Sequence, residues 1–129
     1  MQMLRLRYFL LICLFATAAA AAPLPSGAKA EIDGLLSRLE ASGCQFYRNG
    51  AWHNAADAKS HLLTKLKYLE DRGAVQSAEQ FIELAASTSS VTGQAYLVKC
   101  GSGAAVPSSA WLQSQLQLIR SAGRPTTPK

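Results

Sequence analysis

Five polar residues whose side chains could do chemistry recur along one predicted helix. Asp57, His61, Lys65, Tyr68 and Arg72 follow one another at spacings of three and four residues, which places them on one side of a helix. Such a band could present cationic and hydrogen-bonding groups to an anionic ligand, with a histidine that titrates near neutral pH. The simpler interpretation, preferred on the sequence alone, is a solvated flank whose lysine extends over the core.

A hydroxyl-rich loop over residues 87–93 offers a second candidate chemistry. Ser89 or Ser90 could act as a nucleophile if His61 and Asp57 came within hydrogen-bond reach. The chain has no Gly-x-Ser-x-Gly elbow, and loops rich in serine and threonine are common turns. We therefore assign no catalytic residue and keep a small serine hydrolase as an alternative function.

The cysteines and histidines do not fall in the paired spacing of a zinc site, and no glycine-rich loop of the phosphate-binding kind is present. We therefore expect neither a metal nor a cofactor.

A β-hairpin is predicted around Asn49 and Gly50, because both residue types tolerate positive φ and aromatic residues lie on either side. A two-residue turn sets the register, in which Arg48 pairs with Ala51, Tyr47 with Trp52, and Phe46 with His53. Tyr47 and Trp52 then form a cross-strand aromatic pair, with Arg48 near the tip. We expect the first or last helix to cover this pair; an exposed platform for a sugar ring or a protein is the alternative.

Residues 1–22 have the pattern of a cleaved secretory signal peptide. Arg5 and Arg7 precede an apolar run over residues 8–15, and small residues follow up to Ala22. The apolar run is too short to span a membrane as a helix. We expect export from the cytoplasm and no integral membrane segment after cleavage.

Cleavage removes Cys13 and leaves Cys44 and Cys100 in an oxidising compartment, which favours a disulfide between them. The rival interpretation is a redox-active or intermolecular cysteine, although neither residue belongs to a Cys-x-x-Cys motif.

The remaining pattern predicts an α+β fold, with about four helices packed on a three-stranded antiparallel sheet made of the hairpin and one strand. Residues 23–30 are expected to be a flexible lead-in, 31–121 a single globular domain and 122–129 a disordered tail. The first helix starts near Lys29 and ends at Gly43, and the third strand spans residues 94–100. Asn54, Ser77, and Ser108 or Ser109 are the predicted N-caps of the later helices.

The charge of the chain is modest. Removing Arg5 and Arg7 from its 13 basic residues leaves 11 against 8 acidic ones, so the formal charge falls from +5 to +3. The charges are dispersed and no nucleic-acid fold signature appears, so we expect no DNA or RNA partner.

Three joined motifs over about residues 32–120 resemble the YfeK-like family of small exported bacterial proteins of unknown function. They are Ser-Gly-Cys-x-Phe-x-Arg-Asn-Gly-x-Trp from Ser42, His-Leu-x-x-Lys-x-x-Tyr-Leu from His61, and Ser-Ser-x-Thr-Gly-x-x-Tyr-x-Val-x-Cys from Ser89. The resemblance implies a periplasmic location and one disulfide-linked domain, and it supplies no activity. It singles out a candidate surface made of Arg48, Trp52, His61, Lys65, Tyr68, Ser89, Ser90 and Thr92.

We expect this surface to bind a periplasmic protein or a cell-envelope component without catalysis. An inhibitor or immunity protein for a cell-wall enzyme is a further alternative, consistent with a small, exported, disulfide-linked chain.

Overall fold

Four helices and one sheet make up the described part of the chain, residues 22–124 of a computed structural model. The predicted α+β class with one disulfide is confirmed. The predicted signal peptide lies outside the described residues except for Ala22, as does the end of the predicted tail. The helices are α1 (Ser26–Ala41), α2 (Ala55–Glu70), α3 (Ala78–Ala85) and α4 (Ser108–Ala122), and the strands are β1 (Gln45–Arg48), β2 (Ala51–His53), β3 (Leu97–Lys99) and β4 (Val106–Pro107).

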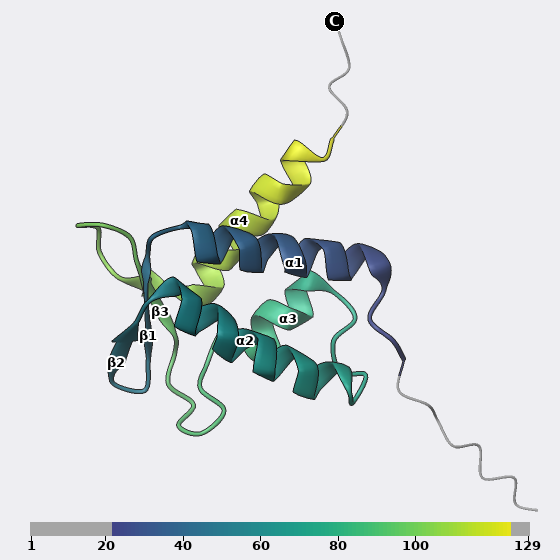
Figure 1. Ribbon diagram of the computed structural model, residues 1–129, viewed down its shortest axis with the longest axis horizontal. Coiled ribbons are helices and arrows are strands. Elements are labelled where there is room, and N and C mark those ends of the chain that lie inside the picture. Colours follow the sequence, from purple (N-terminus) through teal and green to yellow (C-terminus); the bar gives the residue numbers. More distant parts are fainter. Residues whose placement is uncertain (1–21, 125–129) are drawn as a thin grey trace, which may run out of the picture.

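The sheet lies at one end of the helices (Figure 1). Helix α1 runs toward it, the hairpin of β1 and β2 reverses the chain, and α2 runs back beside α1. The strand order is β2-β1-β3-β4, and every neighbouring pair is antiparallel. Strands β1 and β3 are therefore the inner strands, and the last residues of β1 lie opposite the start of β2 on one side and the start of β3 on the other.

The hairpin forms in the predicted register. Arg48 pairs with Ala51, Tyr47 with Trp52, and Phe46 with His53. The two turn residues, Asn49 and Gly50, have φ angles of 49° and 85°, the left-handed conformations that this kind of turn requires.

Apolar faces of all four helices enclose the core. The largest side chains that are almost completely buried come from α1, α3, α4, the sheet and the segment between α2 and α3: Ile32, Leu35, Leu39, Phe81, Ile82, Leu112, Leu116, Val98 and Val75. Helix α2 contributes Leu62 and Leu66, whereas its Ala55, Ala58 and Leu69 are partly buried against the same cluster. One side of α2 consequently stays accessible beside the sheet.

Two of the predicted helix caps are confirmed. The Asn54 side chain accepts a hydrogen bond from the backbone N–H of Asp57 at 2.8 Å, and the Ser77 hydroxyl accepts one from Gln80 at 3.1 Å. The prediction that Ser108 or Ser109 caps α4 is wrong. Helix α4 already begins at Ser108, Pro107 takes the N-cap position, and no side chain caps it. The backbone N–H of Ser108 donates to the carbonyl of Tyr96 at 2.8 Å, so β4 continues directly into the helix without a capping residue between them.

The sheet has four strands, not the three predicted. Val106 and Pro107, which lie outside the three predicted strands, pair with Val98 and Leu97 of β3. Proline lacks an N–H, so it is tolerated at an edge such as this. The third strand is shorter than predicted, at Leu97–Lys99.

Helix α1 starts at Ser26, inside the segment expected to be a flexible lead-in and three residues before Lys29. Pro25 precedes the helix, and its carbonyl accepts a bond from the N–H of Lys29 at 2.9 Å. Ala28 is buried, so packing orders this first turn despite its glycine and proline content. Gly43 follows the helix with a φ of 66°, as its predicted stop requires.

The predicted disulfide joins Cys44 to Cys100, which are 56 residues apart. Gln45 pairs with Lys99 across β1 and β3, so the two cysteines occupy the next opposed position of the same ladder. The covalent link thus ties the start of the hairpin to the end of β3.

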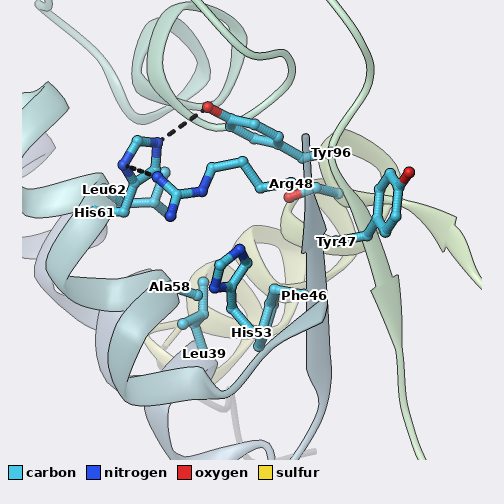
Figure 2. A pocket seen from close by; sticks show the side chains of 10 residues that line it. Leu39, Phe46, Tyr47, Arg48, His53, Ala58, His61, Leu62 and Tyr96 are labelled. Carbon is cyan, nitrogen blue, oxygen red and sulfur yellow. Dashed lines mark hydrogen bonds between the residues drawn. The ribbon is translucent and has the colours of Figure 1, made fainter. Parts of the chain in front are cut away.

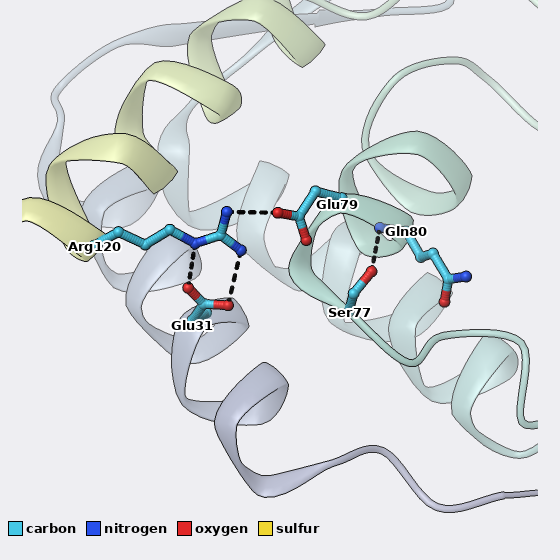
Figure 3. A network of polar contacts seen from close by, with 5 residues as sticks. All are labelled: Glu31, Ser77, Glu79, Gln80 and Arg120. Carbon is cyan, nitrogen blue, oxygen red and sulfur yellow. Dashed lines mark hydrogen bonds and ion pairs between the residues drawn. The ribbon is translucent and has the colours of Figure 1, made fainter.

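An ion-pair network holds three helices together at the other end of the core (Figure 3). Arg120 of α4 donates from Nε and Nη2 to the two carboxylate oxygens of Glu31 on α1, at 2.7 and 3.1 Å. Its Nη1 lies 2.6 Å from Oε1 of Glu79 on α3. These bonds raise the pKa of Arg120 and lower that of Glu79.

Candidate functional site

Four polar residues from three separate segments meet where β1 adjoins α2. Arg48 ends β1, His61 and Lys65 lie one turn apart on α2, and Tyr96 immediately precedes β3. Tyr47 pairs with Leu97, so continuing the ladder places Arg48 opposite Tyr96. We call Arg48, His61, Lys65 and Tyr96 the cationic cluster.

Hydrogen bonds connect every member of the cationic cluster. Nη1 of Arg48 lies 2.6 Å from Nδ1 of His61, and Nε2 of the same ring lies 3.1 Å from the Tyr96 hydroxyl. Nζ of Lys65 lies 3.2 Å from that hydroxyl and 3.0 Å from the carbonyl oxygen of Thr88. Figure 2 shows the Arg48 side chain reaching from the strand to one nitrogen of the His61 ring, with the Tyr96 hydroxyl near the other nitrogen.

The protonation of His61 follows from these contacts. A guanidinium has donors and no acceptor, so Arg48 must donate and Nδ1 of His61 must accept. The proton of the neutral ring is then on Nε2, from which it is donated to the oxygen of Tyr96.

The electrostatics agree with a neutral ring. Partial burial, with the charges of Arg48 and Lys65, lowers the pKa of His61 from 6.5 to about 4. Burial and the charge of Arg48 also lower the pKa of Lys65, and burial raises that of Tyr96. At neutral pH His61 and Tyr96 are therefore uncharged, and the band does not carry the neutral-pH titration suggested by the ordinary pKa of histidine.

A small cavity of about 30 Å³ adjoins the cluster (Figure 2). Arg48, His61 and Tyr96 border it, and most of its other walls are apolar, including Phe46 and Leu62. This volume has room for about one water molecule.

Lys65 also borders an open groove of about 340 Å³ between α2, α3 and the hydroxyl-rich loop. Tyr68 and Ser90 line the groove together with Thr64, Leu69 and Leu84. Tyr68 and Leu84 are 56% and 45% exposed, respectively. Three residues of the predicted surface, Lys65, Tyr68 and Ser90, thus share one accessible hollow, which we call the Lys65 groove.

Ser89 and Thr92 shape the loop beside this groove. Ser89 is buried, and its hydroxyl accepts bonds from the backbone N–H groups of Val91 and Thr92, each at 3.2 Å. The hydroxyl of Thr92 donates to the side-chain oxygen of Asn49 at 2.9 Å. These contacts fix the loop and attach it to the hairpin turn, which gives Ser89 a structural role.

The serine hydrolase alternative lacks its central contact. Within the described residues, neither Ser89 nor Ser90 is hydrogen-bonded to His61, whose nitrogens face Arg48 and Tyr96. The side chain of Asp57 makes no bond to His61 there either. No observation in the structure favours this alternative.

Trp52 lies away from the cationic cluster. Phe46 faces α4, where its ring meets Trp111 edge-on at 5.9 Å, so Tyr47 and Trp52 point from the opposite face of the sheet. Their rings are 5.3 Å apart, as predicted for a cross-strand pair. The prediction that a helix covers the pair is wrong for Trp52, which is 41% exposed, because the helices pack on the Phe46 face.

Tyr96 is the member of the cluster that was not predicted as a site residue. Its alternation with Val98 and Cys100 indicates only a strand residue facing the core. Its ring is indeed buried, and only its hydroxyl reaches the polar groups of α2. No sequence pattern in the residues just before β3 indicates that the Tyr96 hydroxyl contacts α2.

Between residues 22 and 124, no three histidine, cysteine or acidic side chains gather as a metal site would require. None of the helices described is both long and apolar enough to cross a membrane.

Comparison with known proteins gives two matches. A family model described as a family of unknown function, DUF5329, matches residues 26–120. The chain is also 39% identical over 86 residues to an uncharacterized protein, YfeK, of Salmonella typhimurium strain LT2, which covers 66% of this chain and 70% of the relative. No solved structure matches the chain.

Proposed function

Because the chain belongs to DUF5329, a family of unknown function, we propose a function from the site itself: a non-enzymatic, periplasmic module that binds a protein or cell-envelope component. The cationic cluster and the Lys65 groove form the binding surface. The signal-peptide pattern of residues 1–22 and the disulfide between Cys44 and Cys100 support the location.

One observation carries the proposal. Four basic residues in the described part of the chain are partly buried: Arg48, Lys59, Lys65 and Arg120. Lys59 pairs with Glu40, and Arg120 pairs with Glu31 and Glu79. Arg48 and Lys65 have no carboxylate within ion-pair distance in residues 22–124. Partly burying an unpaired cation costs free energy, so a pair of them on one accessible face favours a surface kept for a partner.

An inhibitor or immunity protein for a cell-wall enzyme is one form this function could take. Such a role needs a surface with charged and aromatic anchors. Lys65 and Tyr68 lie side by side in the groove and would supply both.

Affinity capture from an envelope fraction tests the proposal. The full mature chain serves as bait in three forms: wild type, an Arg48→Gln, Lys65→Gln double variant, and a Lys67→Gln control. Lys67 lies on the same helix, is exposed and pairs with Asp71, so its replacement matches the charge change away from the cluster. Partners retained by wild type and Lys67→Gln and lost by the double variant are expected. Identical partners for all three forms would reject the surface.

A further inference from the structure

The directions of the hydrogen bonds in the cationic cluster leave a set of donors without acceptors. The Tyr96 oxygen accepts from Nε2 of His61 and from Nζ of Lys65, which occupies both of its lone pairs. The phenolic hydrogen of Tyr96 then has no acceptor among the described residues.

The two cations also have donors to spare. Among the described residues, only one guanidinium nitrogen of Arg48, Nη1, has a hydrogen-bond partner, the ring of His61. Lys65 has three N–H bonds and uses two of them, on Tyr96 and Thr88. In residues 22–124 no carboxylate lies within ion-pair distance of either cation. The unused groups of the cluster are therefore all donors, and two of them carry positive charge.

We propose, building on the binding function above, that Arg48, Lys65 and the Tyr96 hydroxyl bind an oxyanion, a carboxylate or a phosphate group of the partner. Charged donors form the strongest hydrogen bonds to such oxygens, and a guanidinium can hold two of them at once. The anion neutralises two cations that otherwise face only neutral partners, while His61 holds Arg48 and Tyr96 in position.

Titration of the folded protein with small anions tests this inference. Sodium acetate represents the carboxylate and inorganic phosphate the phosphate, each added at constant ionic strength balanced with sodium chloride. Nitrogen–proton correlation spectra follow the backbone around residues 48, 61, 65 and 96. A saturable shift with either anion is expected, and the anion that produces it identifies the group.

Variants separate a site from general charge effects. Lys65→Gln should weaken the binding about tenfold or more, as expected for the loss of one charged hydrogen bond of about 1.5–3 kcal/mol. Tyr96→Phe should weaken it less, and Lys67→Gln should leave it unchanged. Arg48→Lys keeps the positive charge but removes the paired N–H donors of the guanidinium. It therefore remains informative if Arg48→Gln fails to fold.

The inference is overturned if neither anion gives a saturable shift, or if Lys65→Gln and Lys67→Gln respond alike. The broader binding function would still be supported if capture of a partner depends on Arg48 and Lys65. Conversely, anion binding without any captured partner would support the site and reject the broader function.

Discussion

The hydroxyl of Tyr96 lies 3.1 Å from Nε2 of His61, although 35 residues separate them in the chain. The same oxygen accepts a hydrogen bond at 3.2 Å from Nζ of Lys65, one helical turn beyond His61. The hydroxyl oxygen of Tyr96, the residue just before β3, thus links the sheet to two positions on α2.

Tyr96→Phe should destabilise the protein by about 1–2 kcal/mol. The change removes one oxygen and leaves the N–H of His61 and a proton of Lys65 without an acceptor in a partly buried place. The free energy of unfolding, measured by urea denaturation, checks this. Tyr68→Phe, at a ring that is 56% exposed, is the control and should change stability by less than about 0.5 kcal/mol. Equal effects of the two changes would contradict the role given to the Tyr96 hydroxyl.

His61 should make the folded state less stable in mild acid. Its pKa is 6.5 in an unfolded chain and about 4 in the folded protein. Above the higher value the ring is neutral in both states. As the pH falls from 6.5 toward 4, His61 binds a proton in the unfolded chain but stays neutral in the folded protein. The free energy of unfolding therefore decreases. Denaturation at about pH 7 and about pH 5 should show this loss in wild type and a smaller one in His61→Gln. Equal losses would mean that another group is responsible.

Breaking the disulfide should cost a large part of the stability. The bond closes a loop of 56 residues, for which chain entropy gives about 4 kcal/mol. Denaturation with and without a thiol reductant should show a loss of this order. Mass spectrometry after thiol alkylation provides the chemical check: two alkylated cysteines in protein purified without reductant would contradict both the cross-link and the proposed oxidising location.

Arg120→Gln should lower stability by no more than about 1 kcal/mol, because its ion pairs are partly exposed. The effect should shrink as salt is added, since salt screens exposed charges. Lys29→Gln, which breaks a more exposed pair with Asp33, should have a smaller effect. Thermal or urea denaturation at low and high salt measures both. A salt-independent loss at Arg120 would point to packing of its side chain and not to charge.

Features set by neighbouring residues were predictable from the sequence. The turn at Asn49 and Gly50 and the caps at Asn54 and Ser77 each depend on a few adjacent residues. The expected loss of Cys13 with the signal peptide also predicted the cross-link, because Cys44 and Cys100 then allow only one pairing within the chain.

Features that depend on distant segments were not predictable in the same way. Ser108 suits a helix cap, but the pairing of the chain with β3 up to Pro107 and the bond from its own N–H to the carbonyl of Tyr96 make it the first residue of the helix. Val106 and Pro107 carry a weak strand signal and become a strand because β3 presents a free edge. The site shows the same limit: His61 and Lys65 were predicted as neighbours on a helix, whereas their meeting with Arg48 and Tyr96 required the sheet register.

All four residues of the cationic cluster lie inside the ring that Cys44 and Cys100 close. Val91, in the hydroxyl-rich loop within this disulfide-closed segment, is 89% exposed. Such an exposed loop is a favourable site for proteolytic cleavage. A single cleavage there would leave two fragments still joined by the disulfide. Arg48, His61 and Lys65 would lie on one fragment and Tyr96 on the other. Clipped protein would then migrate as one species until a reductant divides it.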